Sequence, residues 1–195
     1  MLYCMRVLII NGSPRKNGTI ATMLHALADN LVGADVLWID VNALSVRPCT
    51  GCMKCRTTGV CVLPEDDGHR MAKEFCRCDA LVIGTPVYWG NMSGQMKLMF
   101  DRVVPAMMDE PKNGFPIPLH KGKRAVMVTA CTTIWPFSWI CRETTGTLHA
   151  MKEILGYSGF KIVGKMVLSG TRKRKGVPQK MIGKGRRLAN KLLHV

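Results

Sequence analysis

Four cysteines near the middle of the chain have a spacing that suits metal or redox chemistry. Cys49, Cys52, Cys55 and Cys61 follow the pattern Cys-x2-Cys-x2-Cys-x5-Cys, with Gly51 supplying a turn inside it. Three thiolates with two residues between neighbours can surround one face of a [4Fe–4S] cube, and a fourth thiolate can complete its ligand set. The spacing therefore makes these four residues candidate metal ligands.

Two alternatives to an iron–sulfur cluster remain open for this cysteine group. The thiols could stay free of any metal, or they could hold a structural zinc ion. Zinc is disfavoured because the tight triplet would strain a tetrahedral site, which two separated Cys-x2-Cys pairs form more readily. Disulfides are disfavoured because nothing in the chain points to secretion.

A second candidate site is the turn between an apolar run at residues 3–10 and a helical pattern at residues 19–31. Gly12 permits a sharp turn there, and free N–H groups at the start of a helix form a seat for phosphate. The turn is neither a Walker loop nor a Gly-x-Gly-x-x-Gly fingerprint. Its candidate phosphate-binding residues are Ser13, Arg15, Asn17, Gly18 and Thr19.

The elements that must position these residues alternate between strand and helix. Apolar runs predict strands at residues 3–10, 34–41, 80–84, 125–130 and 162–168. Helical spacing predicts helices at residues 19–31, 67–77, 93–108 and 142–155, and a basic amphipathic helix after Pro178. This alternation predicts a three-layer, doubly wound α/β fold with a five-stranded parallel sheet. We expect strand order 2-1-3-4-5, with a Rossmann-type order as the alternative.

In either order, ligands bind at the carboxyl ends of the strands, so the loops after the first, third and fourth strands should carry the chemistry. We expect a single domain over residues 1–195. The cysteine-rich loop spans about residues 48–66, and a Pro- and Gly-rich insertion at about residues 109–122 is a candidate lid or oligomer contact.

The composition and net charge favour some classes of binding partner and disfavour others. The net charge is +15, and residues 161–195 contain no acidic side chain, which favours anionic partners. Nucleic acid is disfavoured because no recognition motif accompanies the charge. No apolar run is long enough for a membrane span, and the N-terminus lacks the features of a signal peptide. We therefore expect a cytoplasmic protein that does not enter membranes.

The segment Gly12 to Thr19, taken with residues 84–94 and the following Asp101 and Arg102, resembles the NADPH-dependent FMN reductase and iron–sulfur flavoprotein group of the flavodoxin-like superfamily. The resemblance implies non-covalent FMN with its phosphate in the first loop. It also implies that the Asp-Arg pair supports the site. The ring would lie along the loops after the third and fourth strands, which gives the candidate contacts Pro86, Val87, Tyr88, Trp89, Gly90, Asn91, Met92, Thr129, Ala130 and Thr132.

The implied function is an FMN-dependent oxidoreductase. It would pass electrons from NAD(P)H, or through a [4Fe–4S] cluster, to a small-molecule or protein acceptor. Flavin chemistry depends on positioning and electrostatics, so no catalytic side chain is named. The alternative is a non-catalytic flavodoxin-type carrier that serves a protein partner, although such carriers tend to be acidic. The resemblance also implies a homodimer or homotetramer. The basic segment 172–175 is a candidate contact for the 2′-phosphate of NADPH or for an acidic redox partner.

Overall fold

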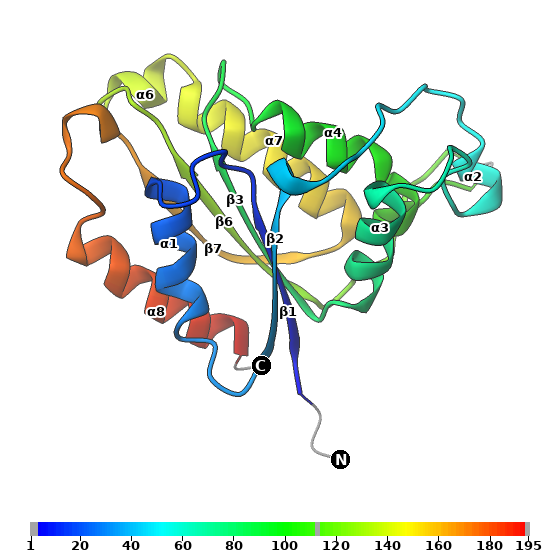
Figure 1. The fold of residues 1–195 in the computed structure, drawn as a ribbon, viewed down its shortest axis with the longest axis horizontal. Helices are drawn as coiled ribbons and strands as arrows, with labels where there is room; N and C mark the ends of the chain where they lie inside the picture. Colours follow the sequence, from blue (N-terminus) through cyan, green and yellow to red (C-terminus); the bar gives the residue numbers. More distant parts are fainter. Residues whose placement is uncertain (1–3, 112–113, 194–195) are drawn as a thin grey trace.

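Five parallel strands form the centre of the fold in the computed structural model, which describes residues 4–111 and 114–193 (Figure 1). They are β1 (Arg6–Asn11), β2 (Asp35–Asp40), β3 (Ala80–Pro86), β6 (Arg124–Ala130) and β7 (Lys161–Leu168). Their order is β2-β1-β3-β6-β7, which confirms the predicted 2-1-3-4-5 order of the main sheet. Tyr3, which the first predicted strand includes, lies outside the described residues.

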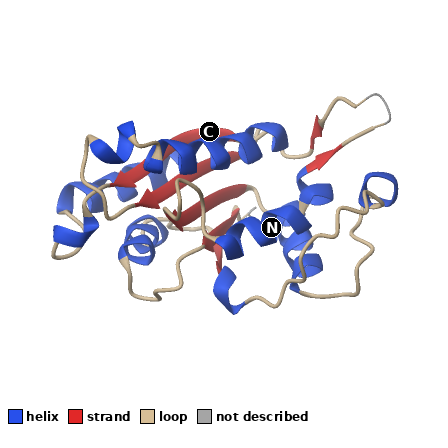
Figure 2. Ribbon diagram, turned by 90° about the horizontal axis from the view of Figure 1, so that it is seen from above, coloured by secondary structure: helices blue, strands red, loops and turns tan. Residues whose placement is uncertain are grey.

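Helices cover both faces of this sheet, as the view from above shows (Figure 2). α1 (Thr19–Ala28) and α8 (Gln179–Leu193) pack on one face. The other face carries α3 (Asp67–Arg77), α4 (Gly94–Arg102), α5 (Val104–Met107) and α7 (Glu143–Ser158). The structure is therefore the three-layer, doubly wound arrangement expected from the sequence.

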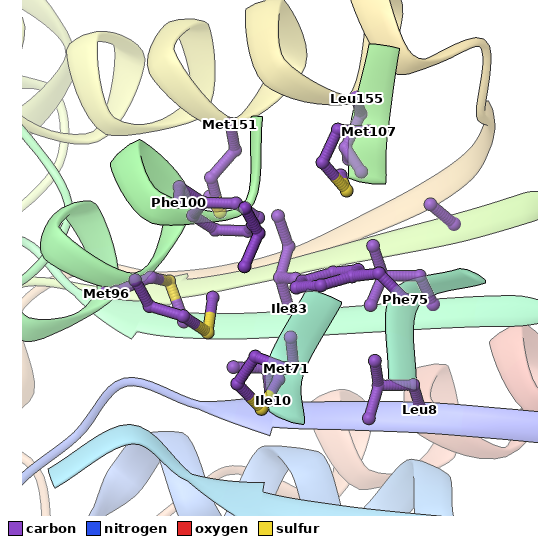
Figure 3. Packing of buried hydrophobic residues seen from close by; sticks show 14 of the residues in the cluster. Leu8, Ile10, Met71, Phe75, Ile83, Met96, Phe100, Met107, Met151 and Leu155 are labelled. Atoms are coloured by element: carbon purple, nitrogen blue, oxygen red, sulfur yellow. The ribbon is translucent and has the colours of Figure 1, made fainter. Parts of the chain in front are cut away.

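The strand residues alternate between the two hydrophobic cores, because successive side chains of a strand point to opposite faces. Val7 and Ile9 of β1 join the core under α1 and α8, whereas Leu8 and Ile10 join the opposite core. In that second core they meet Met71 and Phe75 of α3, Met96 and Phe100 of α4, Met107 of α5, and Met151 and Leu155 of α7 (Figure 3). Burial on both faces explains the nearly continuous apolar runs in the sequence.

The helix predicted at residues 93–108 is wrong as a single element. It is divided into α4 and α5, with Val103 as the C-cap of the first and the N-cap of the second. Pro105 explains the break, because its ring clashes with the carbonyl four residues earlier and it has no N–H to donate. A helix start is the place where a proline is tolerated, and α5 begins there.

The segments between the main elements contain only short pieces of regular structure. The 109–122 segment contributes to a two-stranded antiparallel hairpin of β4 (Met108–Asp109) and β5 (Ile117–Pro118), although residues 112–113 lie outside the described part. Four one-turn helices were not predicted: η1 (Val41–Ala43), α2 (Cys55–Thr58), α6 (Phe137–Ile140) and η2 (Thr171–Lys173). Within the described ranges, no helix has the length and apolar character to cross a bilayer.

Candidate cofactor site

The loop from β1 to α1 is pressed against the end of β3 and the start of α4. The Gly12 N–H donates to the Gly84 carbonyl oxygen at 2.7 Å. A Cβ at Gly12 would lie 2.8 Å from Met96 Cε and 3.1 Å from the Gly84 carbonyl oxygen and from Ser93 Oγ, so a larger residue would have to displace its neighbours. Gly12 thus holds the loop at the carboxyl edge of the sheet, next to the switch point between β1 and β3.

Hydrogen bonds within this loop turn the chain into α1. The Asn11 Oδ1 accepts from the Ser13 N–H at 3.1 Å, and the Ser13 Oγ accepts from the Arg15 N–H at 3.2 Å. The Gly18 N–H donates to the Arg15 carbonyl at 3.1 Å, and a Cβ on Gly18 would lie 2.8 Å from Arg15 Cβ. Gly18 is thereby required for a tight turn directly before the helix.

The N-terminus of α1 has the donors that an anion needs. Its N-cap is Gly18, which provides no side-chain cap, and its first turn contains no acidic residue. The first N–H groups of such a helix have no intrahelical acceptor, and the helix dipole adds positive potential. Arg15, Lys16 and Asn17 are exposed beside it. The donor set therefore fits a phosphate group.

A tight turn follows β3 and forms the edge of a second feature. Tyr88 and Asn91 exchange both of their backbone hydrogen bonds, at 2.9 and 3.0 Å. Between them, Trp89 and Gly90 have φ angles of 52° and 71°, the left-handed conformation of a type I′ turn. Trp89 is fully exposed. A non-glycine residue in this region is strained, and such strain concentrates at functional sites.

This turn borders a groove of about 630 Å³, which we call the ring groove. Its other wall comes from the loop after β6 and the first turn of α7. Arg142, the N-cap of α7, also has a positive φ of 58°. The groove is lined by Val87, Trp89, Gly90, Thr132, Thr133, Cys141, Arg142, Glu143 and Gly146. Its size and position suit a flat heterocyclic ligand.

The structure brings only some of the predicted ring contacts into this groove. Val87, Trp89, Gly90 and Thr132 line it, whereas Tyr88 and Asn91 close the turn through their backbones, and Pro86 ends β3. Buried Met92 packs in the core, and Thr129 and Ala130 are buried at the end of β6. Sequence reasoning missed Thr133 and the lining residues between Cys141 and Gly146. Thr133 directly follows the predicted contact Thr132, whereas nothing local marks residues 141–146, which reach the groove only through the packing of α7.

The predicted cysteine ligands lie in a loop that leaves β2 and projects away from the sheet, with α2 within it (Figure 1). Cys49 and Cys52 are exposed, and Cys55 and Cys61 are partly buried. Burial raises the pKa of the Cys55 thiol, and the neighbouring thiols of Cys61, Cys49 and Cys52 raise it further. Cys55 is therefore within electrostatic reach of the other three thiols.

These four thiols nevertheless do not surround a common point. Across residues 4–111 and 114–193, no three His, Cys, Asp or Glu side chains are grouped closely enough to hold a metal ion. The backbone N–H of Lys54 lowers the pKa of the exposed Cys52 thiol, which favours the thiolate that metals bind. The donor set thus suits a cluster, while its geometry is not that of a closed cage.

A buried ion pair fixes both ends of this cysteine loop. Arg102 of α4 is fully buried and donates to the two carboxylate oxygens of Asp66 at 2.7 and 3.0 Å. It also donates to the Arg47 carbonyl at 2.7 Å. Asp66 in turn accepts from the backbone N–H groups of Arg47 and Gly68. Residues on either side of the four cysteines are therefore tied to α4 and to the start of α3.

The electrostatics of this pair agree with its geometry. Burial alone would raise the pKa of Asp66, but Arg102 and the N–H groups of Arg47 and Gly68 hold it well below its ordinary value. Burial would lower the pKa of Arg102, yet its ion pair with Asp66 and the nearby Cys61 thiol raise it. Arg102, which the resemblance places in support of the flavin site, instead supports the cysteine loop.

The sequence model of NADPH-dependent FMN reductases matches residues 5–168, which is most of the chain. This chain belongs to the NADPH-dependent FMN reductase family. The match begins just before β1 and ends with β7, so it contains the phosphate loop, the cysteine loop and both walls of the ring groove.

The curated relatives of this FMN reductase family member include proteins that are named iron–sulfur flavoproteins. An iron–sulfur flavoprotein of Methanocaldococcus jannaschii is 33% identical over 105 residues, which are 52% of this chain and 53% of that protein. The chain thus spans about half the length of this curated relative.

Solved structures of other proteins share the fold. An FMN-dependent NADH-azoreductase of Bacillus anthracis in complex with FMN aligns with a TM-score of 0.74 and 14% identity, covering 96% of this chain and 99% of that one. An NAD(P)H:quinone oxidoreductase of Methanothermobacter marburgensis aligns with a TM-score of 0.70 and 20% identity, covering 99% and 98%. At these identities the likeness concerns the fold alone. It shows that this family member has a flavodoxin-like fold, and the strand order of its main sheet agrees.

Proposed function

We propose that this chain binds FMN non-covalently and works as an NAD(P)H-dependent flavin oxidoreductase. One observation carries the proposal: the uncapped N-terminus of α1 and the ring groove both lie on loops at the carboxyl edge of one sheet. An anion-binding turn and a groove for a flat heterocycle, brought to one edge, match the two ends of FMN. Bound FMN would supply the exchange of hydride or electrons between donor and acceptor.

Two groups of residues would hold the two ends of FMN. In the proposal, Ser13, Arg15, Asn17, Gly18 and Thr19 hold the phosphate. Val87, Trp89, Gly90 and Thr132 lie beside the ring, while Pro86, Tyr88, Asn91, Met92, Thr129 and Ala130 fix the loops that carry them. This assignment keeps every predicted cofactor residue at the site, but gives the buried ones a positioning role.

Arg142 is the charged side chain of the ring groove best suited to stabilise negative charge. Glu143 beside it accepts a hydrogen bond from Thr133 Oγ1 at 2.9 Å, which holds its carboxylate toward the β6 loop. No ion pair within the described residues involves Arg142. A guanidinium at this position would favour a ligand ring that gains negative charge on reduction.

The test is a fluorescence titration of the apoprotein with FMN, followed by assays of NADPH and NADH oxidation. We expect saturable quenching of the flavin and turnover with at least one nucleotide. The azo and quinone substrates named for the solved neighbours make an azo dye and a quinone the small-molecule acceptors to try first. No turnover with either nucleotide, together with rapid reduction by a reduced ferredoxin, would instead identify a flavodoxin-type carrier.

We also propose that Cys49, Cys52, Cys55 and Cys61 hold a [4Fe–4S] cluster. The spacing, the electrostatic effect of the other three thiols on Cys55 and the name of the relative support it. Because the open arrangement does not form a cage by itself, the loop would have to close around the cluster. The family member would then have a second electron carrier, tied by Arg102 and Asp66 to the domain that carries the ring groove.

We also propose that the chain forms a homodimer or a homotetramer. Large hydrophobic side chains are exposed around the carboxyl edge of the sheet, and contiguous patches of this kind mark interaction surfaces. Size-exclusion chromatography with light scattering would measure the mass of the FMN-loaded protein. The exposed side chains that line neither groove are Phe137, Trp139 and Ile140.

A further inference from the structure

A second groove, of about 730 Å³, lies on the other side of the loop that follows β6. Thr132 and Thr133 line the ring groove, and the next two residues, Ile134 and Trp135, line this one. Its opposite wall is the segment after β7, which lies beside α6 (Figure 1). We call it the β7 groove; its polar and aromatic lining residues are Trp135, Ser169, Lys173 and Arg174.

The two walls of the β7 groove are tied together by backbone hydrogen bonds. The Gly170 N–H donates to the Thr133 carbonyl at 2.8 Å. Thr171 donates twice to the Cys131 carbonyl, from its N–H at 3.1 Å and from its Oγ1 at 3.0 Å. The groove is therefore formed before a ligand arrives, and it is fixed relative to the ring groove by the shared β6 loop.

Its side chains suit an aromatic anion. Trp135 is 75% exposed, so its indole is accessible for stacking. Arg174 donates from Nε to the Ser169 carbonyl at 3.1 Å, which orients its guanidinium and leaves the terminal nitrogens for another acceptor. Among residues 4–111 and 114–193, no ion pair uses Lys173 or Arg174. The two cations thus have no anion of their own.

We infer that the β7 groove binds the 2′-phosphorylated adenosine end of NADPH. The inference rests on the proposed function, in which a nicotinamide nucleotide supplies the electrons. Trp135 stacks on the adenine, while Lys173 and Arg174 bind the 2′-phosphate through charge-assisted hydrogen bonds. The nicotinamide end of the same molecule reaches the ring groove across the β6 loop.

The lining of the groove also discriminates between the two nucleotides. Sites that prefer NADH use a carboxylate to accept from the ribose 2′-hydroxyl, whereas a nearby arginine accommodates the 2′-phosphate of NADPH. No Asp or Glu lines the β7 groove, and residues 161–195 contain none. Lys173 and Arg174 therefore determine a preference for NADPH over NADH.

The test measures binding of adenosine 2′,5′-bisphosphate and of 5′-AMP to the FMN-loaded full chain by titration calorimetry. Loading with FMN keeps both probes out of the phosphate loop. We expect the bisphosphate to bind about tenfold or more tightly than 5′-AMP, because charge-assisted contacts to the 2′-phosphate are present only for the former. The double variant Lys173→Ser/Arg174→Ser should lose this difference. Trp135→Ala should weaken both probes alike.

The matched control is Arg186→Ser/Arg187→Ser, which removes the same charge from exposed positions of α8 that do not line the groove. It should bind both probes as the unaltered chain does. Equal affinities for the two probes in the unaltered chain, or a preference that survives Lys173→Ser/Arg174→Ser, would overturn the inference. Equal losses in the control pair would also overturn it, because they would indicate general charge attraction.

Turnover assays separate this inference from the proposed function. In Lys173→Ser/Arg174→Ser, kcat/KM for NADPH should fall about tenfold while that for NADH is unchanged. A chain that shows the expected probe binding but oxidises neither nucleotide would support the groove and count against the reductase. A chain that oxidises NADPH without the probe preference would keep the reductase and reject the groove.

Discussion

Gly146, in the first turn of α7, packs directly against the carbonyl of Gly90 in the turn after β3. A Cβ on Gly146 would overlap the Gly90 carbonyl oxygen, a backbone atom of the turn that Tyr88 and Asn91 close. The contact joins the two walls of the ring groove across 56 residues of sequence. The width of the groove is therefore set by the absence of a side chain at one helical position.

Gly146→Ala should accordingly weaken FMN binding. The added methyl group must push the Gly90 turn away from α7, and overpacking of this kind costs about 1–3 kcal/mol. We expect a loss of FMN affinity in a fluorescence titration and a lower free energy of unfolding in a denaturant series.

Gly156→Ala provides the control in the same helix. A Cβ at Gly156 meets nothing within 4 Å, and its φ is not positive, so alanine should stabilise the protein by about 0.5–1 kcal/mol without changing FMN affinity. Equal FMN affinities for the two variants would show that the Gly90–Gly146 contact does not shape the ligand site.

This contact also shows where sequence reasoning stops. The strand order and the phosphate loop could be predicted, because apolar runs and the turn after the first strand are local signals. The packing of Gly146 on Gly90 and the pairing of Arg102 with Asp66 depend on how distant elements meet, and no local pattern marks them. The break at Val103 was different: Pro105 is a local signal, and the prediction of one helix over residues 93–108 did not use it.

Thr19→Asp should separate the stability of α1 from its affinity for phosphate. Thr19 is the first residue of α1, where a carboxylate favours the helix by about 0.3–1 kcal/mol. The same charge would repel the phosphate of FMN at close range, so we expect about a tenfold or greater loss of FMN affinity with unchanged or higher thermal stability. Asn190→Asp, which adds the same charge at an exposed position of α8, should keep full affinity. Unaltered FMN binding by Thr19→Asp would remove the phosphate from this loop.

Arg102→Met should destabilise the fold far more than removal of a surface pair. It leaves the Asp66 carboxylate, whose side chain is 8% exposed, without its partner, and breaking a buried pair in this way costs about 3–5 kcal/mol. On the same helix, Asp101→Asn breaks an exposed pair with Lys97 and should cost less than about 1 kcal/mol. Urea denaturation measures both. Addition of Asp66→Asn to Arg102→Met should recover part of the loss, and full additivity would contradict the coupling.

The same pair should make stability depend on acid pH. Asp66 has a lower pKa in the folded chain than in the unfolded chain, so between the two values only the unfolded chain takes up the proton. Its contribution is complete above the unfolded pKa of about 4 and is lost as the pH falls through the folded pKa. The difference in unfolding free energy between the unaltered chain and Asp66→Asn should shrink from pH 6 to pH 3. A constant difference over that range would exclude this linkage.

Iron content should depend on the cysteines of the loop and not on a cysteine elsewhere in the chain. After anaerobic reconstitution, the unaltered chain should carry about four irons with matching sulfide, and its spectrum should show absorption beyond the flavin bands. Cys55→Ser removes the thiol that feels the charges of the other three, and should lose most of the iron. Cys76→Ser changes an exposed cysteine of α3 and should keep it. Flavin bands alone in the unaltered chain would mean that the four thiols work without a metal. Equal iron loss in both variants would mean that iron binds the cysteines of this chain without selection for the loop.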